Sequence, residues 1–587
     1  MPPRCPSGRL SSGWVHLGGI NRRQKFLWLF AIKGYFGSTK KIMKKRLDTI
    51  PKADKRILEH PYVGHLHDVV SRLVEELTAQ KGKIEELEAE LRRLKKLPKK
   101  PKLEASKLDE EPPGEEQAAE EEKKKRPGSE KRSKKKDLPI DEYREVKVEG
   151  VGPGWHFGGY QDYVVQSIEV RRNNICYRRE VYLNPEGERV VASLPPGVQG
   201  HDFGEELRRY VIYLYNECHV TQPLIYQHLN TLGVDISKGQ VNNILNEDPI
   251  IELFSEEMES VFMAGMAASE EVRADDTSAP HQGRKEFCTC INTDLFTYFK
   301  STATKSRVNF LQILQGPNKD YHLNEEAIAY CENQGLTAGY LALLRAHQGS
   351  ILSDIEAFES FLEQLKVTAV HARRTVTEGC LIGSLIAHGF DSDKIIHSDG
   401  AGQFDIFCHA LCWKHAERPL KKLHVHNAGQ QGQFDDKMNA FWQLYRRLKP
   451  YKNLPAEEQA ERKQALESQF GQLCEPVEGF AALNQVLEKF QQQKGKMLLV
   501  LDRPVTSMHN NHTEGQIREY AKRRKISGST RSEKGRIARD TFTSLKKTCQ
   551  KLGVSFWDYL LDRLKGQWDI PPLTEVLYQR VQQPTAL

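Results

Sequence analysis

The sequence has no long apolar run and no dense group of cysteines. Its apolar stretch at residues 26–32 is much shorter than the ~18 residues that a membrane helix needs, and no signal-peptide cleavage site follows it. The eleven cysteines are scattered from Cys5 to Cys549, unlike the closely spaced cysteines that staple small secreted domains. These absences exclude a multispanning membrane protein and favour a reducing cytosol.

The sequence also has no strong excess of one charge. Lysine and arginine number 86 against 79 aspartates and glutamates, a net charge of +7, so a nucleic-acid partner must be argued from local clusters. The 587 residues are 39% hydrophobic and 28% charged, with a mean hydropathy of −0.60. Roughly three or four domains of ordinary size fit this length. This length predicts a multidomain protein, and the strand-like and helical runs given below make its class α/β.

The N-terminal part of the chain divides into three predicted segments. Residues 1–65 are an extension that we expect to be partly disordered, with Met43 as an alternative start. Over residues 66–97 apolar residues recur in alternating steps of four and three, which predicts a coiled coil that pairs protomers; an amphipathic helix packed on its own chain is the alternative. Residues 98–138 carry blocks of charge and almost no apolar residue, which predicts a disordered linker.

Two small modules are expected next. Strand-like runs at 162–170 and 179–183, with a turn at 184–187, predict a small β-rich module over 139–200. In 201–250, a helical stretch at 205–217 precedes two short helices at 222–232 and 238–245, with Ser237 as N-cap of the last. This pair predicts a helix-turn-helix that binds DNA, although short helix pairs are equally common as plain structure.

Three acidic residues stand out by their local context. Asp275 ends a strand-like run at 271–275, and two further runs follow at 286–291 and 295–301. Asp399 ends the run 394–399, where the following glycines leave room beside a bound group. Glu514 follows Asn510 and Asn511, either of which can cap a helix. Carboxylates bind Mg²⁺, and two such ions can assist phosphoryl transfer, whereas any one acid alone is more often a surface charge.

A basic segment follows Glu514. Positive side chains interleaved with small residues suit a phosphate backbone, and a solvated helix face is the alternative. The candidate DNA-binding residues are Arg518, Lys522, Arg523, Arg524, Lys525, Arg531 and Lys534.

The segments around the three acids resemble those of bacterial insertion-sequence transposases of the IS66 family, which have a DDE catalytic domain. Asp275-Asp276-Thr277 matches the family's first motif. Asp399-Gly400, followed by Cys412-Trp413-Lys414-His415-Ala416, matches the second. Asn510-Asn511-His512-Thr513-Glu514, followed by Arg524-Lys525 and Gly528-Ser529, matches the third. The resemblance covers about residues 66–565.

The resemblance implies an RNase H-like catalytic domain over 265–535, with helical insertions at about 315–390 and 404–505, and C-terminal helices over 536–587. Asp275, Asp399 and Glu514 would bind two Mg²⁺ ions, with Mn²⁺ as a substitute. The enzyme would cut the element's terminal inverted repeats and join the 3′-hydroxyl ends to target DNA. A homodimer or higher oligomer, a cytoplasmic, nucleoid-associated location and no membrane contact are expected, and the need for accessory proteins is left open.

Some positions depart from the family pattern. The paired cysteines of its zinc site have no counterpart near Cys176, so no zinc is expected in 139–200. His509 replaces the usual aspartate before the asparagine pair. Trp413, His415 and Asn511 are candidates for lining the site, with packing as the alternative for the first two. Two other functions are kept: a non-catalytic DNA-binding regulator derived from a transposase, and an RNase H-like nuclease without strand transfer.

Overall fold

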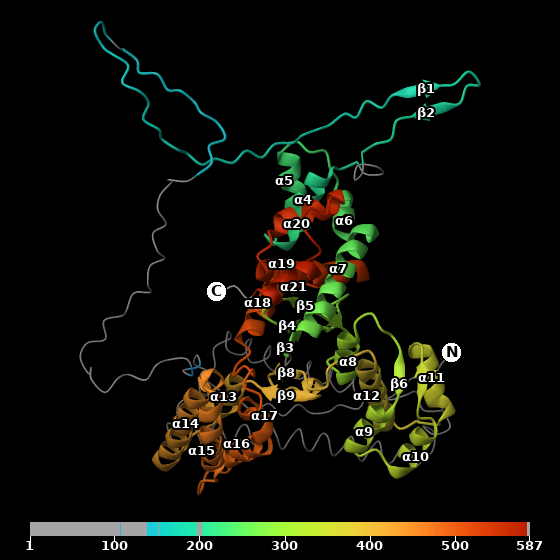
Figure 1. The fold of residues 1–587 in the computed structure, drawn as a ribbon, viewed down its shortest axis with the longest axis vertical. Helices are drawn as coiled ribbons and strands as arrows, with labels where there is room; N and C mark the ends of the chain where they lie inside the picture. Colours follow the sequence, from blue (N-terminus) through green and yellow to red (C-terminus); the bar gives the residue numbers. More distant parts are fainter. Residues whose placement is uncertain (1–105, 107, 109–137, 151, 196–201, 584–587) are drawn as a thin grey trace, which may run out of the picture. The chain divides into compact units, whose positions relative to one another are not determined.

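The computed structural model describes residues 106, 108, 138–150, 152–195 and 202–583 (Figure 1). All of them belong to the second of two compact units, residues 100–587. The predicted extension at 1–65, the predicted coiled coil at 66–97 and nearly all of the predicted linker at 98–138 lie outside the described residues.

A five-stranded mixed sheet lies at the centre of the described fold. Its strand order is β5-β4-β3-β8-β9, in which β5, β4 and β3 are antiparallel and β3, β8 and β9 are parallel. Sequence patterns predicted four of the five strands, all except β9. The strands are β3 (Glu271–Ser278), β4 (Phe287–Asn292), β5 (Thr297–Thr302), β8 (Ile395–Ser398) and β9 (Cys408–Leu411).

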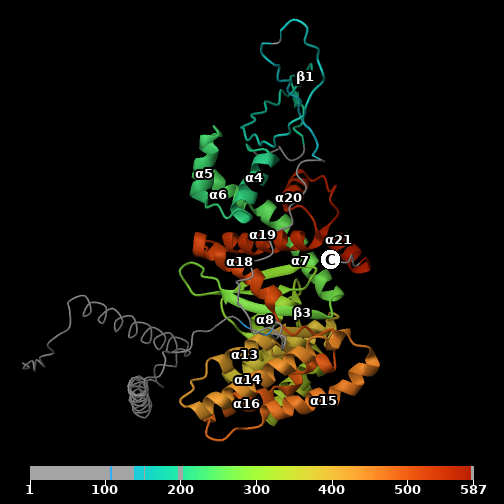
Figure 2. The same ribbon diagram turned by 90° about the vertical axis from the view of Figure 1, so that its left-hand side faces the viewer.

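Helices cover this sheet and also satisfy its edge. α7 (Asp248–Ala268), α18 (Asn511–Ser527) and α19 (Glu533–Leu552) pack on the antiparallel strands (Figures 1 and 2). The edge strand β5 pairs only with β4, so its outward N–H groups need other partners. Side chains of α19 supply them: the N–H of Phe299 donates to Ser544 Oγ at 2.9 Å, and that of Ser301 to Asp540 Oδ2 at 2.7 Å.

The first insertion, between β5 and β8, folds around a long helix. That helix, α12, packs on α8, α9 and β6. The helices expected in this insertion are present, and two short strands, β6 and β7, pair beside them. The elements are α8 (Arg307–Gln315), β6 (Tyr321–Leu323), α9 (Glu325–Asn333), α10 (Ala338–Ala346), β7 (Ser350–Leu352), α11 (Ile355–Gln364) and α12 (Val370–Ala387).

The second insertion, between β9 and α18, is helical as expected and has its own hydrophobic core around Trp413, Phe441 and Phe470. It starts and finishes at one place. The N–H of Trp413 donates to the carbonyl of Met508 at 3.0 Å, and the N–H of Asn510 donates to Cys412 Sγ at 3.3 Å. Its helices are α13 (Trp413–Lys421), α14 (Ala428–Leu448), α15 (Ala456–Cys474), α16 (Ala481–Gln492) and α17 (Lys494–Met497).

The region expected to be β-rich is less regular than predicted. It contains one hairpin, β1 (Val181–Leu183) and β2 (Arg189–Val191), around the predicted turn at 184–187. The strand predicted at 162–170 is wrong. Residues 162–170 are assigned to no strand, and most of their apolar side chains are exposed, among them Tyr163 and Ile168, whereas a strand is stabilised by neighbours to pair and pack with.

The helix pair forms as the sequence predicted. α5 (Gln222–Thr231) and α6 (Lys238–Asn246) pack together and against α4 (Glu205–Asn216). Ser237 caps α6, since its Oγ accepts from the N–H of Gln240 while the Gln240 side chain accepts from the N–H of Ser237.

The C-terminal helices are α20 (Phe556–Lys565) and α21 (Leu573–Gln582). Within the described residues, no helix combines the length and apolar character needed to cross a membrane.

Candidate active site

Asp275 lies on the central strand β3 and is partly buried. Burial raises the pKa of Asp275 to about 7; the backbone N–H of Asp276, which donates to Asp275 Oδ1 at 2.7 Å, opposes that increase. The charges of Asp399, Asp276 and Glu514 raise the pKa further. Asp399 and Glu514 therefore lie near enough for their charges to affect the carboxyl group of Asp275.

Asp399 reaches this place through the parallel pairing of β3 and β8. Arg273 is in register with His397, and Asp275 and Asp399 each lie two residues further along their strands. Asp399 is exposed just beyond the strand, where the N–H of Ala401 donates to its Oδ1 at 2.9 Å. Gly400 has a φ of +86°, a conformation that glycine adopts without steric cost.

Glu514 lies in the first turn of α18, and side chains fasten that helix to β3. Asn510 occupies the N-cap position but makes no side-chain cap bond. Its amide donates instead to the carbonyl of Ala274 at 3.1 Å, directly before Asp275. Near the other end of α18, Arg524 donates to Thr277 Oγ1 at 3.1 Å. Asn510 was one of the two residues expected to cap this helix. It occupies the N-cap position, but its side chain bonds to β3 and not to the helix.

Two residues of α13 hold Glu514. Arg418 Nη2 lies 2.8 Å and His415 Nε2 3.5 Å from Glu514 Oε1. Burial lowers the pKa of His415 and the Arg418 charge lowers it further, while Asp399 and Glu514 act in the opposite direction. His415 thus lines the acidic cluster, as the sequence suggested, whereas Arg418 was not anticipated.

Asp276 is held by protein groups, in contrast to its neighbour Asp275. Lys305 forms an ion pair with Asp276 Oδ1, and Gln403 Nε2 donates to Asp276 Oδ2 at 2.6 Å. Asp276 was visible in the first motif and could have been recognised from it. Lys305 and Gln403 stand in no motif, so only the fold reveals their role.

The three acids do not form the tightest ligand group. Among the residues that the structure describes, one carboxylate oxygen each from Asp275, Asp399 and Glu514 cannot be chosen so that all lie within 4.8 Å of one another. Arg418 draws the Glu514 carboxylate toward α13.

Trp413 does not line the site. It is 1% exposed, its indole N–H donates to the carbonyl of Met497 at 2.9 Å, and its ring packs in the core of the second insertion. The packing alternative therefore holds for Trp413. Asn511 begins α18 and is partly buried, and its role stays a prediction.

The basic segment has an inner and an outer face. Arg523 is 3% exposed and stacks over the Tyr215 ring at 4.5 Å, so its predicted contact with DNA is wrong: helical periodicity turns it inward. Arg524 is occupied by β3, and Lys534 pairs with Asp248 at 2.6 Å. The exposed members are Arg518, Lys522, Lys525, Arg531 and Lys534.

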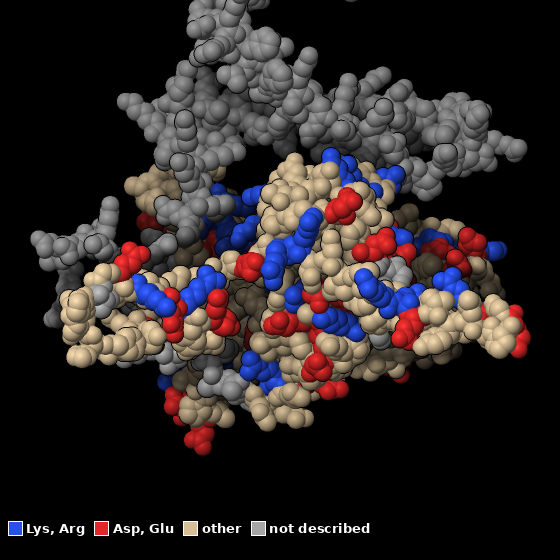
Figure 3. Space-filling view, turned by 90° about the horizontal axis from the view of Figure 1, so that it is seen from above, with Lys and Arg blue, Asp and Glu red and all other residues tan. Residues whose placement is uncertain are grey.

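Basic side chains do not dominate every face of the molecule. On the face in Figure 3, which grey atoms partly cover, lysine and arginine are interspersed with acidic and other residues. On the outer face of α18, Arg518 Nη2 lies 3.7 Å from Glu514 Oε2.

The comparisons with known proteins agree with these motifs. A family model described as "Transposase IS66 family" matches residues 371–538, a stretch that includes Asp399 and Glu514. The uncharacterized protein y4jO of Sinorhizobium fredii (strain NBRC 101917 / NGR234) is 37% identical over 303 residues, covering 51% of this chain and 94% of that protein. No solved structure matches the chain.

Proposed function

The chain belongs to the IS66 family of transposases, and we propose that it is a DDE-type enzyme that cleaves the ends of a mobile element and joins them to target DNA. The observation that carries the proposal is that Asp399 ends a strand in parallel register with the strand of Asp275, while Asn510 fastens the helix of Glu514 to that same strand. The charges of Asp399 and Glu514 also act on the carboxyl group of Asp275. Repulsion among like charges is a cost that a fold retains where a cation or a reaction uses it.

The strand order supports an RNase H-like core. Three antiparallel strands followed by two parallel ones place the first acid on the central strand and the second at the end of its neighbour. The third acid then arrives on a helix that packs on the same strand. This arrangement accounts for three acids that are distant in the sequence and close in the fold.

The donor set fits Mg²⁺. Carboxylate oxygens are hard ligands, and a cation would offset the charges of Asp399, Asp276 and Glu514, which add to the effect of burial in raising the pKa of Asp275. In this proposal Asp275 holds two ions, while Asp399 and Glu514 each hold one. When bound, the ions would activate the attacking oxygen and stabilise the leaving oxygen of a phosphodiester.

The surrounding side chains keep these ligands in place. Lys305 and Gln403 hold the side chain of Asp276 and so help to fix the part of β3 that also carries Asp275. Arg418 and His415 restrain Glu514. The exposed Arg518 and Lys522 lie along the same helix as Glu514 and would neutralise phosphates of the DNA backbone.

Two further parts complete the proposal. The α5–α6 pair would place α6 in a major groove at the element ends, and a coiled coil over 66–97 would pair protomers so that both ends are handled together. The predicted oligomer and any accessory proteins belong to this proposal as well.

The decisive test is cleavage of a labelled element end by Glu514→Gln with Mg²⁺ present. The wild type should cleave, and the variant should bind the same DNA without cleaving it, because the amide keeps the side-chain shape and loses the anionic ligand. Glu458→Gln is a matched control, since Glu458 also pairs with an arginine, Arg462, at 2.9 Å, but on α15 outside the site. Cleavage retained in Glu514→Gln would refute the proposal.

Two other outcomes identify the alternative functions. A regulator would bind DNA without a divalent ion, and the wild type itself would not cleave. A nuclease without strand transfer would cleave element ends but fail to join pre-cut 3′-hydroxyl ends to a target plasmid.

A further inference from the structure

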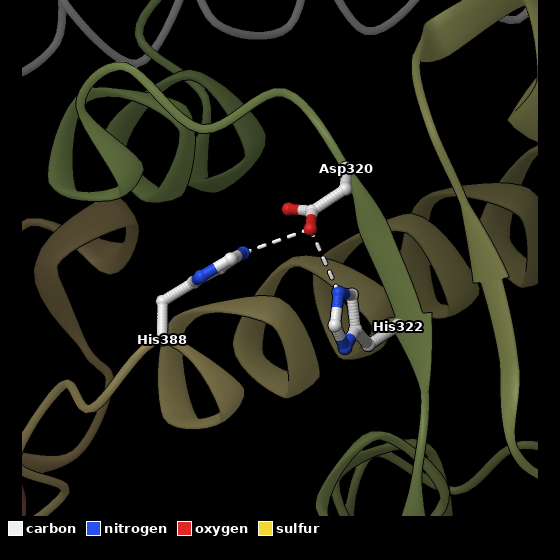
Figure 4. Close-up of side chains that lie close together, drawn as sticks. All are labelled: Asp320, His322 and His388. Carbon is white, nitrogen blue, oxygen red and sulfur yellow. Dashed lines mark hydrogen bonds and ion pairs between the residues drawn. The ribbon is translucent and has the colours of Figure 1, made fainter.

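A second group of ligand-type side chains lies in the first insertion, away from the three acids in the sequence. Asp320 and His322 come from the segment that enters and forms β6, and His388 follows α12 (Figure 4). His322 Nε2 and His388 Nε2 each lie 2.8 Å from the same atom, Asp320 Oδ2. Of the described residues, these three form the group whose ligand atoms all lie within 4.8 Å of one another.

We propose that Asp320, His322 and His388 form a binding site for a divalent transition metal of the zinc class. Two imidazole nitrogens and one carboxylate oxygen are the donors that Zn²⁺ takes in proteins, with a fourth position for water. In a tetrahedral site with bonds of about 2.0 Å, ligand atoms are roughly 3.3 Å apart. The 2.8 Å separations therefore need to open by only about half an ångström.

The groups behind the ligands support this assignment. Ser384 Oγ donates to the other oxygen of Asp320, Oδ1, at 2.6 Å, and Gln315 Nε2 donates to Ser384 Oγ at 2.8 Å. Both Ser384 and Gln315 are buried. Hydrogen bonds to a ligating carboxylate from buried outer groups are typical of metal sites, where they fix its orientation.

Close packing of α12 on β6 brings the three residues together. A Cβ atom at Gly383 would lie 2.4 Å from the carbonyl oxygen of His322 and 2.3 Å from Asn324 Oδ1. Glycine at this position therefore allows the helix to approach the strand. His388 is the C-cap residue of α12, where the partial negative charge of the helix end favours a cation.

Metal binding at this site changes the protonation of the cluster. A neutral imidazole binds an ion through Nε2 only when its proton is on Nδ1, so a ring that donates Nε2–H to Asp320 would move that proton to Nδ1 as the ion binds. The bound ion would tie the C-terminal end of α12 to β6. The alternative is that the cluster is a hydrogen-bonded group that binds no metal.

The test uses the full-length protein after chelation, titrated with Co²⁺ as a spectroscopic probe and then with Zn²⁺ as competitor. Mg²⁺ is kept in excess to fill the carboxylate site. The wild type should show visible absorption bands of Co²⁺ bound through nitrogen. Ellman titration with and without metal reports any contribution from cysteine.

Three variants separate metal binding from structure. His388→Asn should remove one equivalent of bound Co²⁺, and His347→Asn should not; His347 is the matched control because it is the C-cap residue of α10 in the same insertion. Ser384→Ala should keep the site and weaken its affinity about 10–100-fold, as outer-group losses do.

Equal Co²⁺ binding by the wild type and His388→Asn would overturn the proposal, as would a wild type that shows no nitrogen-bound Co²⁺. Circular dichroism confirms that each variant is folded. Because DNA cleavage is not part of the readout, the result is independent of the function proposed for the three acids.

Discussion

Asp275 and Asp320 are both partly buried carboxyl groups on strands or strand ends, yet the fold shifts their pKa values in opposite directions. Asp275 receives one backbone N–H and faces three other acids, and its pKa rises to about 7. Burial would also raise the pKa of Asp320, but hydrogen bonds from Ser384, His388 and His322 outweigh it and lower that pKa.

The difference lies in how each carboxylate is matched with its neighbours. The Asp275 cluster has an excess of hard, negatively charged oxygens, which suits Mg²⁺ and a phosphate substrate. The Asp320 cluster combines one carboxylate with two imidazole nitrogens, a donor set that suits a divalent transition-metal ion. The two proposals therefore assign different classes of ion to the two clusters.

The largest expected effect separates the two aspartates by activity. Asp275→Asn should reduce cleavage of element ends by about 10³-fold or more, because several kcal/mol of transition-state stabilisation depend on the metal-holding carboxylate. Asp320→Asn should stay within about threefold of the wild type per folded molecule, since Asp320 lies in the first insertion and not on the elements that carry the three acids, so its loss leaves the barrier unchanged. Initial cleavage rates measure both. Similar losses of cleavage rate in the two variants would show that the two aspartates do not differ in their roles.

Stability should respond with opposite signs. The folded pKa of Asp275 lies above the unfolded value of 3.8, so its effect on the free energy of unfolding becomes less favourable as pH rises from about 4 to 7. Without divalent ions at pH 8, Asp275→Asn should therefore stabilise the protein, by on the order of 1–4 kcal/mol.

For Asp320 the sign is reversed. Its folded pKa is lowered, so its stabilising contribution is present at neutral pH and is lost as pH falls below the unfolded value. Asp320→Asn should lower the melting temperature at pH 8. Denaturant unfolding in EDTA, from about pH 4 to pH 8, gives the free energy of unfolding of both variants. If both variants changed it in the same direction at pH 8, the environments assigned to the two aspartates would be contradicted.

A smaller effect tests the packing that builds the Asp320 cluster. Gly383→Ala should destabilise the protein by about 1–3 kcal/mol, because the new methyl group meets backbone and a capping side chain. Gly432→Ala is the control: an added Cβ there meets nothing within 4 Å, and replacing a helical glycine by alanine should stabilise by about 0.5–1 kcal/mol. Thermal unfolding distinguishes them, and a stabilising Gly383→Ala would show that the close approach is unnecessary.

The smallest expected effect concerns the positive charge around the two clusters. Lys525→Ala, on the exposed face of α18, should reduce the slope of log binding constant against log salt by about one phosphate contact. Lys319→Ala, exposed beside Asp320, should leave that slope unchanged. Filter binding at several salt concentrations provides the measurement, and an equal change in both would place DNA elsewhere on the surface.

Local patterns were sufficient for much of the fold. Strand-like runs led to β3 and β8 with their acids, and Ser237 was recognised as a cap because capping depends on residues only three positions apart. The family motifs located Glu514 on its helix. These signals are encoded within a few neighbouring residues, which is why the sequence alone revealed them.

Long-range relations were not predictable in the same way. Arg523 and Lys525 are both basic, and only the packing of α18 decides that the first is buried and the second exposed. Arg418 meets Glu514, and His388 meets Asp320, across segments that share no pattern. The exposed run at 162–170 fails for the related reason that strand propensity cannot supply a packing partner.

The paired contacts of Trp413 with Met508 and of Asn510 with Cys412 have a consequence for how this chain can vary. The helices between these two contacts leave the sheet after β9 and return to it at α18, so the whole insertion joins the sheet at one place. We therefore expect that a change in the length of this insertion alters the surface of the protein and leaves the position of Glu514 unchanged.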